Sequence, residues 1–182
     1  MKKNYFTILK KLSFILLISV YTLNGFSQEK SIFDIARNGS LTELKKAVKK
    51  DPEIINKVSK EGYTPLTLSC YSGNNDVAKY LIENVKNINA KSGYGTPLMA
   101  AVVKNNLKLT ALLIKHKAEI NATDPNGTSA LHYAVMFGLE DITKLLVNAK
   151  ANTKLKDNRG NSAIDYAKIK GNLNIIKLLN NN

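Results

Sequence analysis

The sequence predicts an all-α solenoid in which short helix–turn–helix units stack along one axis. Three observations predict it: a motif that recurs at nearly constant spacing, turn residues at fixed places within each copy, and apolar residues with helical periodicity between them. The copies of the motif are separated by 32, 33 and 33 residues, and a period near 33 is the mark of a stacked repeat array. The four copies are Thr64-Pro65-Leu66, Thr96-Pro97-Leu98, Ser129-Ala130-Leu131 and Ser162-Ala163-Ile164.

Residues 1–27 lie outside the array and have the layout of a secretory signal peptide. Four lysines precede the apolar run 12–26, and small residues precede Gln28, so cleavage is predicted between Ser27 and Gln28. The alternative is a retained membrane anchor, but the run is shorter than the roughly 20 residues that a spanning helix needs. No Cys follows the run, which excludes the lipoprotein route. The junction and the Lys/Asn-rich composition resemble secreted proteins of Gram-negative bacteria, which implies a periplasmic or extracellular location.

Each unit is predicted to begin with a short helix capped by the Ser or Thr of the motif, whose hydroxyl can accept from an unpaired N–H of the first turn. Pro65 and Pro97 follow at the first helical position, where the missing N–H costs nothing. The helix is expected to end at a residue that tolerates the left-handed conformation. The predicted end residues are Gly73, Asn105, Gly138 and Gly171.

A second helix is predicted to return in each unit, because apolar residues recur there at i, i+3 and i+4. These helices cover 77–82, 109–114, 142–147 and 175–179. Polar linkers rich in Asn and Gly follow the second helices and are predicted to be turns between units. The linkers are 87–95, 121–127 and 152–160.

The recurring pattern resembles the ankyrin repeat, whose units open with Gly-x-Thr-Pro-Leu-His and continue with small residues, a Gly turn and a Leu-rich second helix. Residues 130–134, Gly138 and 144–146 keep that pattern. After the predicted signal peptide at 1–27, the resemblance implies five units, with the linkers as a row of fingers beside a concave groove. The implied units are 28–60, 61–92, 93–125, 126–158 and 159–182.

The first and last units are expected to cap a complete array, because a terminal unit has one face without a neighbour and that face must be polar. The last unit carries Lys168 where inner units carry Cys70, Val102 and Val135. At the other end, residues 32–39 resemble a first ankyrin unit that lacks the Thr-Pro opening.

No arrangement of residues predicts catalysis, a metal site or a cofactor. The two histidines stand apart: His116 falls in a predicted turn, and His132 occupies the position where the ankyrin pattern carries a structural His. Cys70 is the only Cys, is expected to be a buried apolar residue, and has no group beside it that would activate a thiolate. Zinc spacing and a phosphate-binding loop are also missing, so the sequence favours a non-enzymatic protein.

The ankyrin resemblance implies that the residues just before each Gly turn face the groove. Four of them recur at intervals of 32, 33 and 33 and are expected to form an apolar stripe; the alternative is that Val103 and Ile169 belong to the core. Aromatic and Met anchors with a charged rim are typical of protein-binding patches. The predicted partner-binding residues are Tyr71, Val103, Met136 and Ile169 of the stripe, Phe137 beside it, Tyr63 and Tyr94 in the fingers, and Lys104, Arg159 and Lys170 at the rim.

The sequence therefore predicts a monomeric protein-binding module of the bacterial cell envelope, with a scaffolding, protective or immunity role. The alternative is electrostatic attachment to envelope polyanions or anionic lipid, because the net charge is +13 and basic residues concentrate at 45–60 and 150–170. Nucleic acid is disfavoured because base readers prefer Arg, and the chain has 25 Lys and 2 Arg.

Overall fold

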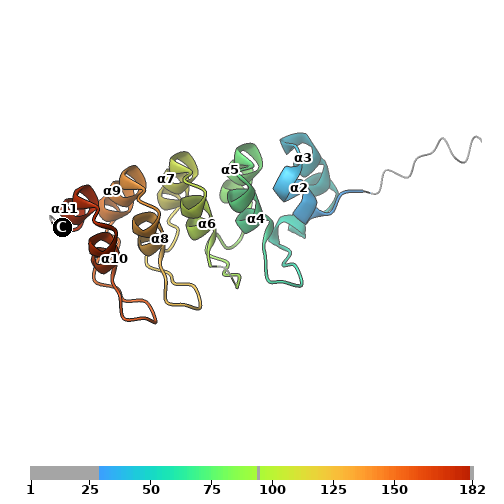
Figure 1. The fold of residues 1–182 in the computed structure, drawn as a ribbon. Helices are drawn as coiled ribbons and strands as arrows, with labels where there is room; N and C mark the ends of the chain where they lie inside the picture. The colour runs from blue at the N-terminus through green and yellow to red at the C-terminus, as the bar shows by residue number, and fades with distance from the viewer. Residues whose placement is uncertain (1–28, 94, 181–182) are drawn as a thin grey trace, which may run out of the picture.

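The computed structural model describes residues 29–93 and 95–180, which form ten α-helices and one short 3-10 helix (Figure 1). In Figure 1 the helices stand in two rows, and the loops between units project from the side of the even-numbered helices. The predicted all-α repeat solenoid is confirmed. The inner helices are α2 Ile32–Asn38, α4 Pro65–Ser72, α6 Pro97–Val103, α8 Ala130–Met136 and α10 Ala163–Lys170; the outer helices are α3 Leu41–Lys50, α5 Asn75–Asn84, α7 Leu107–Lys115, α9 Glu140–Asn148 and α11 Leu173–Asn180, with the 3-10 helix at Pro52–Asn56.

The predicted signal peptide and Tyr94 lie outside the described residues. Within the described part of the chain, every helix is too short or too polar to cross a bilayer.

The inner helices begin where the motif predicts. Thr64 Oγ1 accepts from the N–H of Thr67 at 3.1 Å, and Thr96 does the same with Met99 at 3.4 Å. In the last unit the N–H and the hydroxyl of Ser162 both donate to Asp165 Oδ2, at 2.9 and 2.6 Å. Each cap satisfies polar groups that the first helical turn leaves without a partner.

The helices reverse at the predicted left-handed residues, which have φ values of 74° at Gly73, 52° at Asn105, 69° at Gly138 and 66° at Gly171. Two further residues other than glycine take this conformation without being predicted to. Lys117 has φ 63° after α7, and Lys150 has φ 67° after α9. Side chains rarely adopt this region, so these two turns carry backbone strain.

The core lies between the two rows of helices and repeats with the sequence period. Leu66, Leu98 and Leu131 are each 1% exposed on the inner helices. Leu81, Leu113 and Leu146 are fully buried at equivalent places on the outer helices. Cys70 is also fully buried, as predicted, and burial raises the pKa of its thiol to about 12.

Asparagine side chains tie successive units together at the ends of the outer helices. Asn56, Asn89 and Asn121 recur in neighbouring units, and each side-chain oxygen accepts a backbone N–H from the next unit. The donors are Lys86 at 2.9 Å, Glu119 at 2.8 Å and Asn152 at 2.7 Å. These bonds satisfy linker backbone that no helix could satisfy.

Candidate functional site

The apolar stripe predicted on the inner helices is partly exposed. Tyr71 is 55% exposed, Phe137 54% and Ile169 72%, whereas Val103 and Met136 are half-buried. Ile169 is therefore a surface residue, which decides against its alternative place in the core. Tyr71 and Ile169 stand at equivalent places of the second and fifth units, and Phe137 stands one residue beyond that place in the fourth, so a partner can cover exposed apolar side chains at the ends of these inner helices.

Lys104 and Tyr71 come together from neighbouring units, at the end of their inner helices. The Lys104 ammonium lies 5.2 Å from the centre of the Tyr71 ring, within the range of a cation–π contact. The contact holds the ring of Tyr71 beside a positive charge, so the N-terminal part of the stripe presents an aromatic and a cationic group side by side.

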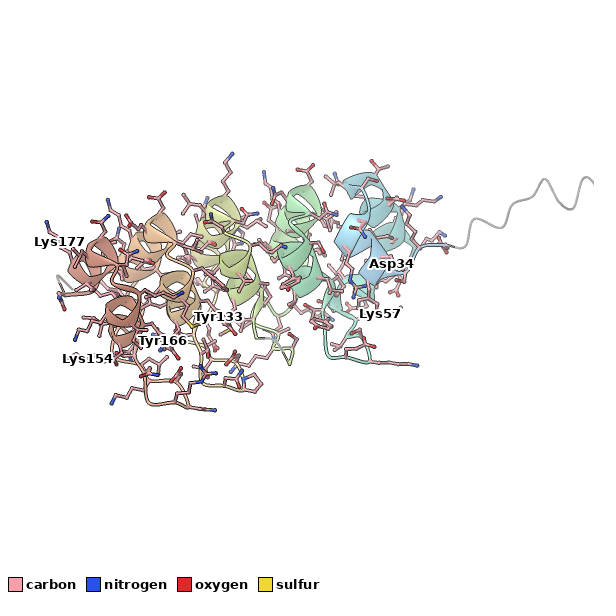
Figure 2. The ribbon with its side chains drawn as sticks, in the orientation of Figure 1. Asp34, Lys57, Tyr133, Lys154, Tyr166 and Lys177 are labelled. Carbon is pink, nitrogen blue, oxygen red and sulfur yellow. The ribbon has the colours of Figure 1, made fainter. Side chains whose placement is uncertain are left out.

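In the last two units, an aspartate of the finger bonds a tyrosine of the inner helix. The hydroxyl of Tyr133 donates to Asp124 Oδ2 at 2.7 Å, and the hydroxyl of Tyr166 donates to Asp157 Oδ2. Both tyrosines lie on the finger side of α8 and α10 (Figure 2). Burial, reinforced by the hydrogen bond to Asp124 and its charge, raises the pKa of Tyr133 to about 12.

The same aspartates also organise their own turns. Asp124 Oδ1 accepts from the N–H groups of Asn126 and Thr128, at 2.8 and 2.9 Å. Asp157 Oδ1 repeats this arrangement with Arg159 and Asn161, at 2.9 and 3.0 Å. The hydrogen bond from Tyr166 and these two N–H groups hold the pKa of Asp157 below its usual value. Each carboxylate thus closes a turn and joins it to a helix.

The last two fingers are bonded to each other. The N–H of Asn158 donates to the carbonyl of Asn126 at 2.9 Å, and Asn158 Nδ2 donates to the carbonyl of Pro125 at 3.0 Å. His132, which is fully buried, adds a third tie because its Nε2 lies 3.2 Å from the carbonyl of Asn161. Its Nδ1 accepts from the N–H of Ser129 at 3.2 Å, so the neutral ring donates from Nε2. His132 is a structural residue, as predicted.

A cleft of about 260 Å³ opens between these two fingers and the inner helices behind them. Met136 lies in its wall. The ring of the next residue, Phe137, stacks on that of Tyr133, with 6.3 Å between the ring centres and 12° between the ring planes. The cleft is lined by Asn126, Thr128, Tyr133, Met136, Asp157, Asn158, Arg159 and Tyr166. It brings together two of the predicted site residues, Met136 and Arg159, from different units.

A family profile described as ankyrin repeats (3 copies) matches residues 32–124 and 109–182. The chain belongs to the ankyrin-repeat family. Ankyrin repeats are general protein–protein interaction modules.

Curated relatives share the repeats over part of their length. The chain is 32% identical over 123 residues to alpha-latrotoxin-Lhe1a of Latrodectus hesperus, covering 62% of this chain and 8% of the toxin. It is 26% identical over 122 residues to a putative ankyrin repeat protein of Rickettsia bellii, covering 63% of this chain and 69% of that protein. It is 39% identical over 82 residues to the B-cell lymphoma 3 protein homolog of Mus musculus, covering 43% of this chain and 18% of that protein. Most of the length of the toxin and of the mouse protein therefore has no counterpart in this ankyrin array.

The other predicted site residues are scattered along the ankyrin units. Tyr63 is half-buried at the base of its finger, where its N–H donates to Ser59 Oγ at 3.1 Å. Arg159 and Lys170 are exposed in the last unit. Whether these residues bind a partner stays a prediction.

The two Asp–Tyr pairs are the feature of the site that sequence reasoning missed. In both units the aspartate precedes the tyrosine by nine residues, and the two pairs are 33 residues apart. This recurrence was a usable signal, because a bond that is built into the repeat must recur with its period. The earlier units lack it, since Ser59 and Leu68 stand at these positions in one and Lys91 and Ala100 in the next.

The basic residues at the two ends of the array have different surroundings. Among the described residues, all five ion pairs lie between residues 29 and 86, including Lys30 with Glu43 at 2.8 Å, Lys57 with Asp51 at 3.2 Å and Lys86 with Glu53 at 2.7 Å. Residues 150–180 contain seven basic and two acidic side chains, and none of them is in an ion pair within the described part of the chain. The described residues contain no cluster of His, Cys, Asp and Glu that could hold a metal ion.

Proposed function

We propose that this ankyrin-repeat protein is a non-enzymatic binding module that holds one protein partner in its groove. The observation that carries the proposal is the set of exposed apolar side chains at the ends of stacked inner helices: Tyr71 and Ile169 at equivalent places of the second and fifth units, and Phe137 one residue beyond that place in the fourth. Large apolar side chains on a soluble protein surface cost solubility unless something covers them. Aromatic anchors of this kind supply most of the affinity in protein interfaces.

The bonded fingers support the proposal because they hold the groove in one shape before the partner arrives. A segment that is ordered in advance loses little conformational entropy on binding, so more of the contact energy appears as affinity. The ties from Asp124 to Tyr133 and from Asn158 to Pro125 are of this kind.

A pull-down tests the proposal, using the full-length chain with a C-terminal tag expressed in its own cells. The comparison is a variant with Tyr71→Ala, Phe137→Ser and Ile169→Ser, whose three side chains are more than half exposed and leave the core intact. We expect one protein to be retained by the parent and lost by the variant, with unchanged circular dichroism. Equal capture by the two chains would refute a groove-based site.

The second candidate function is electrostatic attachment to envelope polyanions or anionic lipid. The cations of residues 150–180 favour it, because none of them forms an ion pair with a residue that the structure describes. Binding of this type should collapse between low and high salt, because screening shortens the reach of exposed charges to about 10 Å at 0.1 M. Retention of the partner at high salt would favour binding in the groove over electrostatic attachment.

We also propose that the protein acts in the bacterial cell envelope or outside the cell, on the basis of the signal-peptide layout of residues 1–27. The mass of the tagged chain purified from cell envelopes tests this, since cleavage would leave Gln28 as the first residue. A chain that keeps Met1 and stays in the cytoplasm would contradict it. A scaffolding, protective or immunity role then depends on which protein is captured.

A further inference from the structure

The two ends of the array carry similar numbers of basic residues but differ in the charge they present. Residues 29–61 contain eight basic and six acidic side chains, and ion pairs there join Glu29, Asp34, Glu43 and Asp51 to basic neighbours. Residues 150–180 contain seven basic and two acidic side chains. The C-terminal end therefore presents the larger net positive charge.

The two acids of the C-terminal end are already occupied. Asp157 accepts from the hydroxyl of Tyr166 and from two backbone N–H groups. Asp165 accepts from the N–H and the hydroxyl of Ser162. Lys156 and Lys168 contribute to lowering the pKa of Asp165 but form no ion pair with it within the described residues. The internal acids thus leave the cations of this end available to an external anion.

The cleft between the last two fingers places one of these cations next to the apolar anchors. Arg159 lies in its wall with Met136, and its backbone is fixed because its N–H donates to Asp157 Oδ1 at 2.9 Å. Phe137 is exposed immediately beside Met136 and stacks on Tyr133. Lys170 and Ile169 follow at the end of the next inner helix, both exposed. Each of these two cations therefore has an apolar neighbour: Arg159 shares the cleft with Met136, and Lys170 follows Ile169 in the chain.

We propose that the partner docks an acidic linear segment on the C-terminal half of the groove, with Asp or Glu side chains of the segment at Arg159 and at Lys170, and aromatic or aliphatic side chains of the segment on Phe137 and on Ile169. The guanidinium of Arg159 can take a carboxylate through two parallel N–H bonds. The neighbouring rings and aliphatic side chain supply the area that charge alone lacks. This inference rests on the proposed protein-binding function and names the chemistry of the partner.

Selection from a displayed library of random linear peptides tests it, with the full chain immobilised through a C-terminal tag. We expect enriched peptides to share an acidic residue beside an aromatic or aliphatic one. The affinity of one enriched peptide is then measured for the parent and for two variants of equal net charge. One is Arg159→Gln with Lys170→Gln; the other is Lys46→Gln with Lys49→Gln, which removes two exposed cations from the N-terminal end.

Relative to the parent, we expect Kd for the peptide to rise about tenfold or more in the C-terminal variant and less than about twofold in the N-terminal variant. Equal weakening in both variants, tighter binding to vesicles that contain phosphatidylglycerol than to the peptide, or no enriched peptide would each overturn the inference. Peptides that lack acids and are lost with Phe137→Ser would overturn it while leaving the proposed protein-binding function standing. The proposed function itself fails only if the groove variant captures the cellular partner as the parent does.

Discussion

The fingers of the last two units are built differently from the finger of the second unit. In the last two, a carboxylate joins the turn to the inner helix and the turns bond to each other. In the second unit, Ser59 stands in place of the aspartate and bonds only within its turn, through the N–H of Tyr63. One repeat pattern thus carries fingers bonded to an inner helix at one end and, at the other, a turn in which a serine replaces the aspartate.

This difference coincides with the difference in charge. The end with bonded fingers is the end whose cations have no ion pair among the described residues, and the end with many ion pairs has the simpler turn. A rigid surface with unpaired charge suits recognition, because the charges are held in place without internal partners. If these bonds determine stability, the last two fingers contribute more to the free energy of unfolding than the finger of the second unit does.

The largest expected effect comes from removing Asp124. Asp124→Ala removes the acceptor of the Tyr133 hydroxyl and of two backbone N–H groups, so we expect the free energy of unfolding to fall by about 3 kcal/mol. Ser59→Ala is the matched control, and the loss of the bond from the Tyr63 N–H should cost about 1 kcal/mol. Urea unfolding of both variants measures the two losses. Equal losses would show that the Asp–Tyr bond adds nothing to the finger.

The next prediction concerns Gly127 and Gly160, and it distinguishes the contact between two fingers from the backbone strain of a turn. Gly127 and Gly160 are equivalent, with φ values of 74° and 80°, so an Ala at either place should cost about 1 kcal/mol of backbone strain. At Gly127 a Cβ would also lie 2.7 Å from Asn158 Oδ1 and 3.0 Å from its backbone N, whereas at Gly160 it would meet nothing within 4 Å.

We therefore expect Gly127→Ala to lower the free energy of unfolding by about 1 kcal/mol more than Gly160→Ala, since the next finger must shift. Thermal unfolding monitored by circular dichroism measures the difference. If both substitutions had the same effect, the two fingers would not be in firm contact.

The alkaline limit of stability should depend on Tyr133. Its pKa is raised from 10.0 to about 12 in the folded chain, so its contribution is fully present below pH 10 and is lost as the pH rises through 12. Tyr133→Phe should lower stability at neutral pH and make the decline between pH 10 and 12 shallower. Urea midpoints of parent and variant across this window measure it, and parallel curves would contradict the assignment.

The sequence predicted the regular parts of the fold because they depend on residue types at fixed spacing. Thr64 and Thr96 cap helices through their own hydroxyls, and Gly73 reverses the chain because it lacks a side chain. Each of these is a local consequence of one residue, so it can be predicted without knowing what lies nearby in space.

The candidate site was harder to predict because it depends on contacts between elements. Asp124 meets Tyr133 only because the finger folds back along the inner helix, and the ion pairs of the N-terminal end join residues as far apart as Lys86 and Glu53. The exposure of Ile169 depends equally on the stacking of units, which is why the sequence left its place open between groove and core. Charge could be counted from the sequence, but its pairing could not.

The smallest effect is a gain in stability at a turn on the outer side. Lys117 has φ 63°, and Lys117→Gly should raise the free energy of unfolding by up to about 1 kcal/mol, because Gly adopts this conformation without a Cβ clash. The equivalent residue in the second unit is Val85, whose φ of −74° is ordinary for any side chain.

Val85→Gly is therefore the comparison, and it should lose more than about 1 kcal/mol, through the greater freedom of glycine in the unfolded chain and through the lost packing of the half-buried Val85 side chain against the core. Urea unfolding at neutral pH measures both changes. Changes of opposite sign in the free energy of unfolding would show that two turns at the same place in the repeat differ in backbone strain. The residue types alone do not predict this difference. A loss in both variants would instead mean that the Lys117 side chain contributes more than its backbone costs.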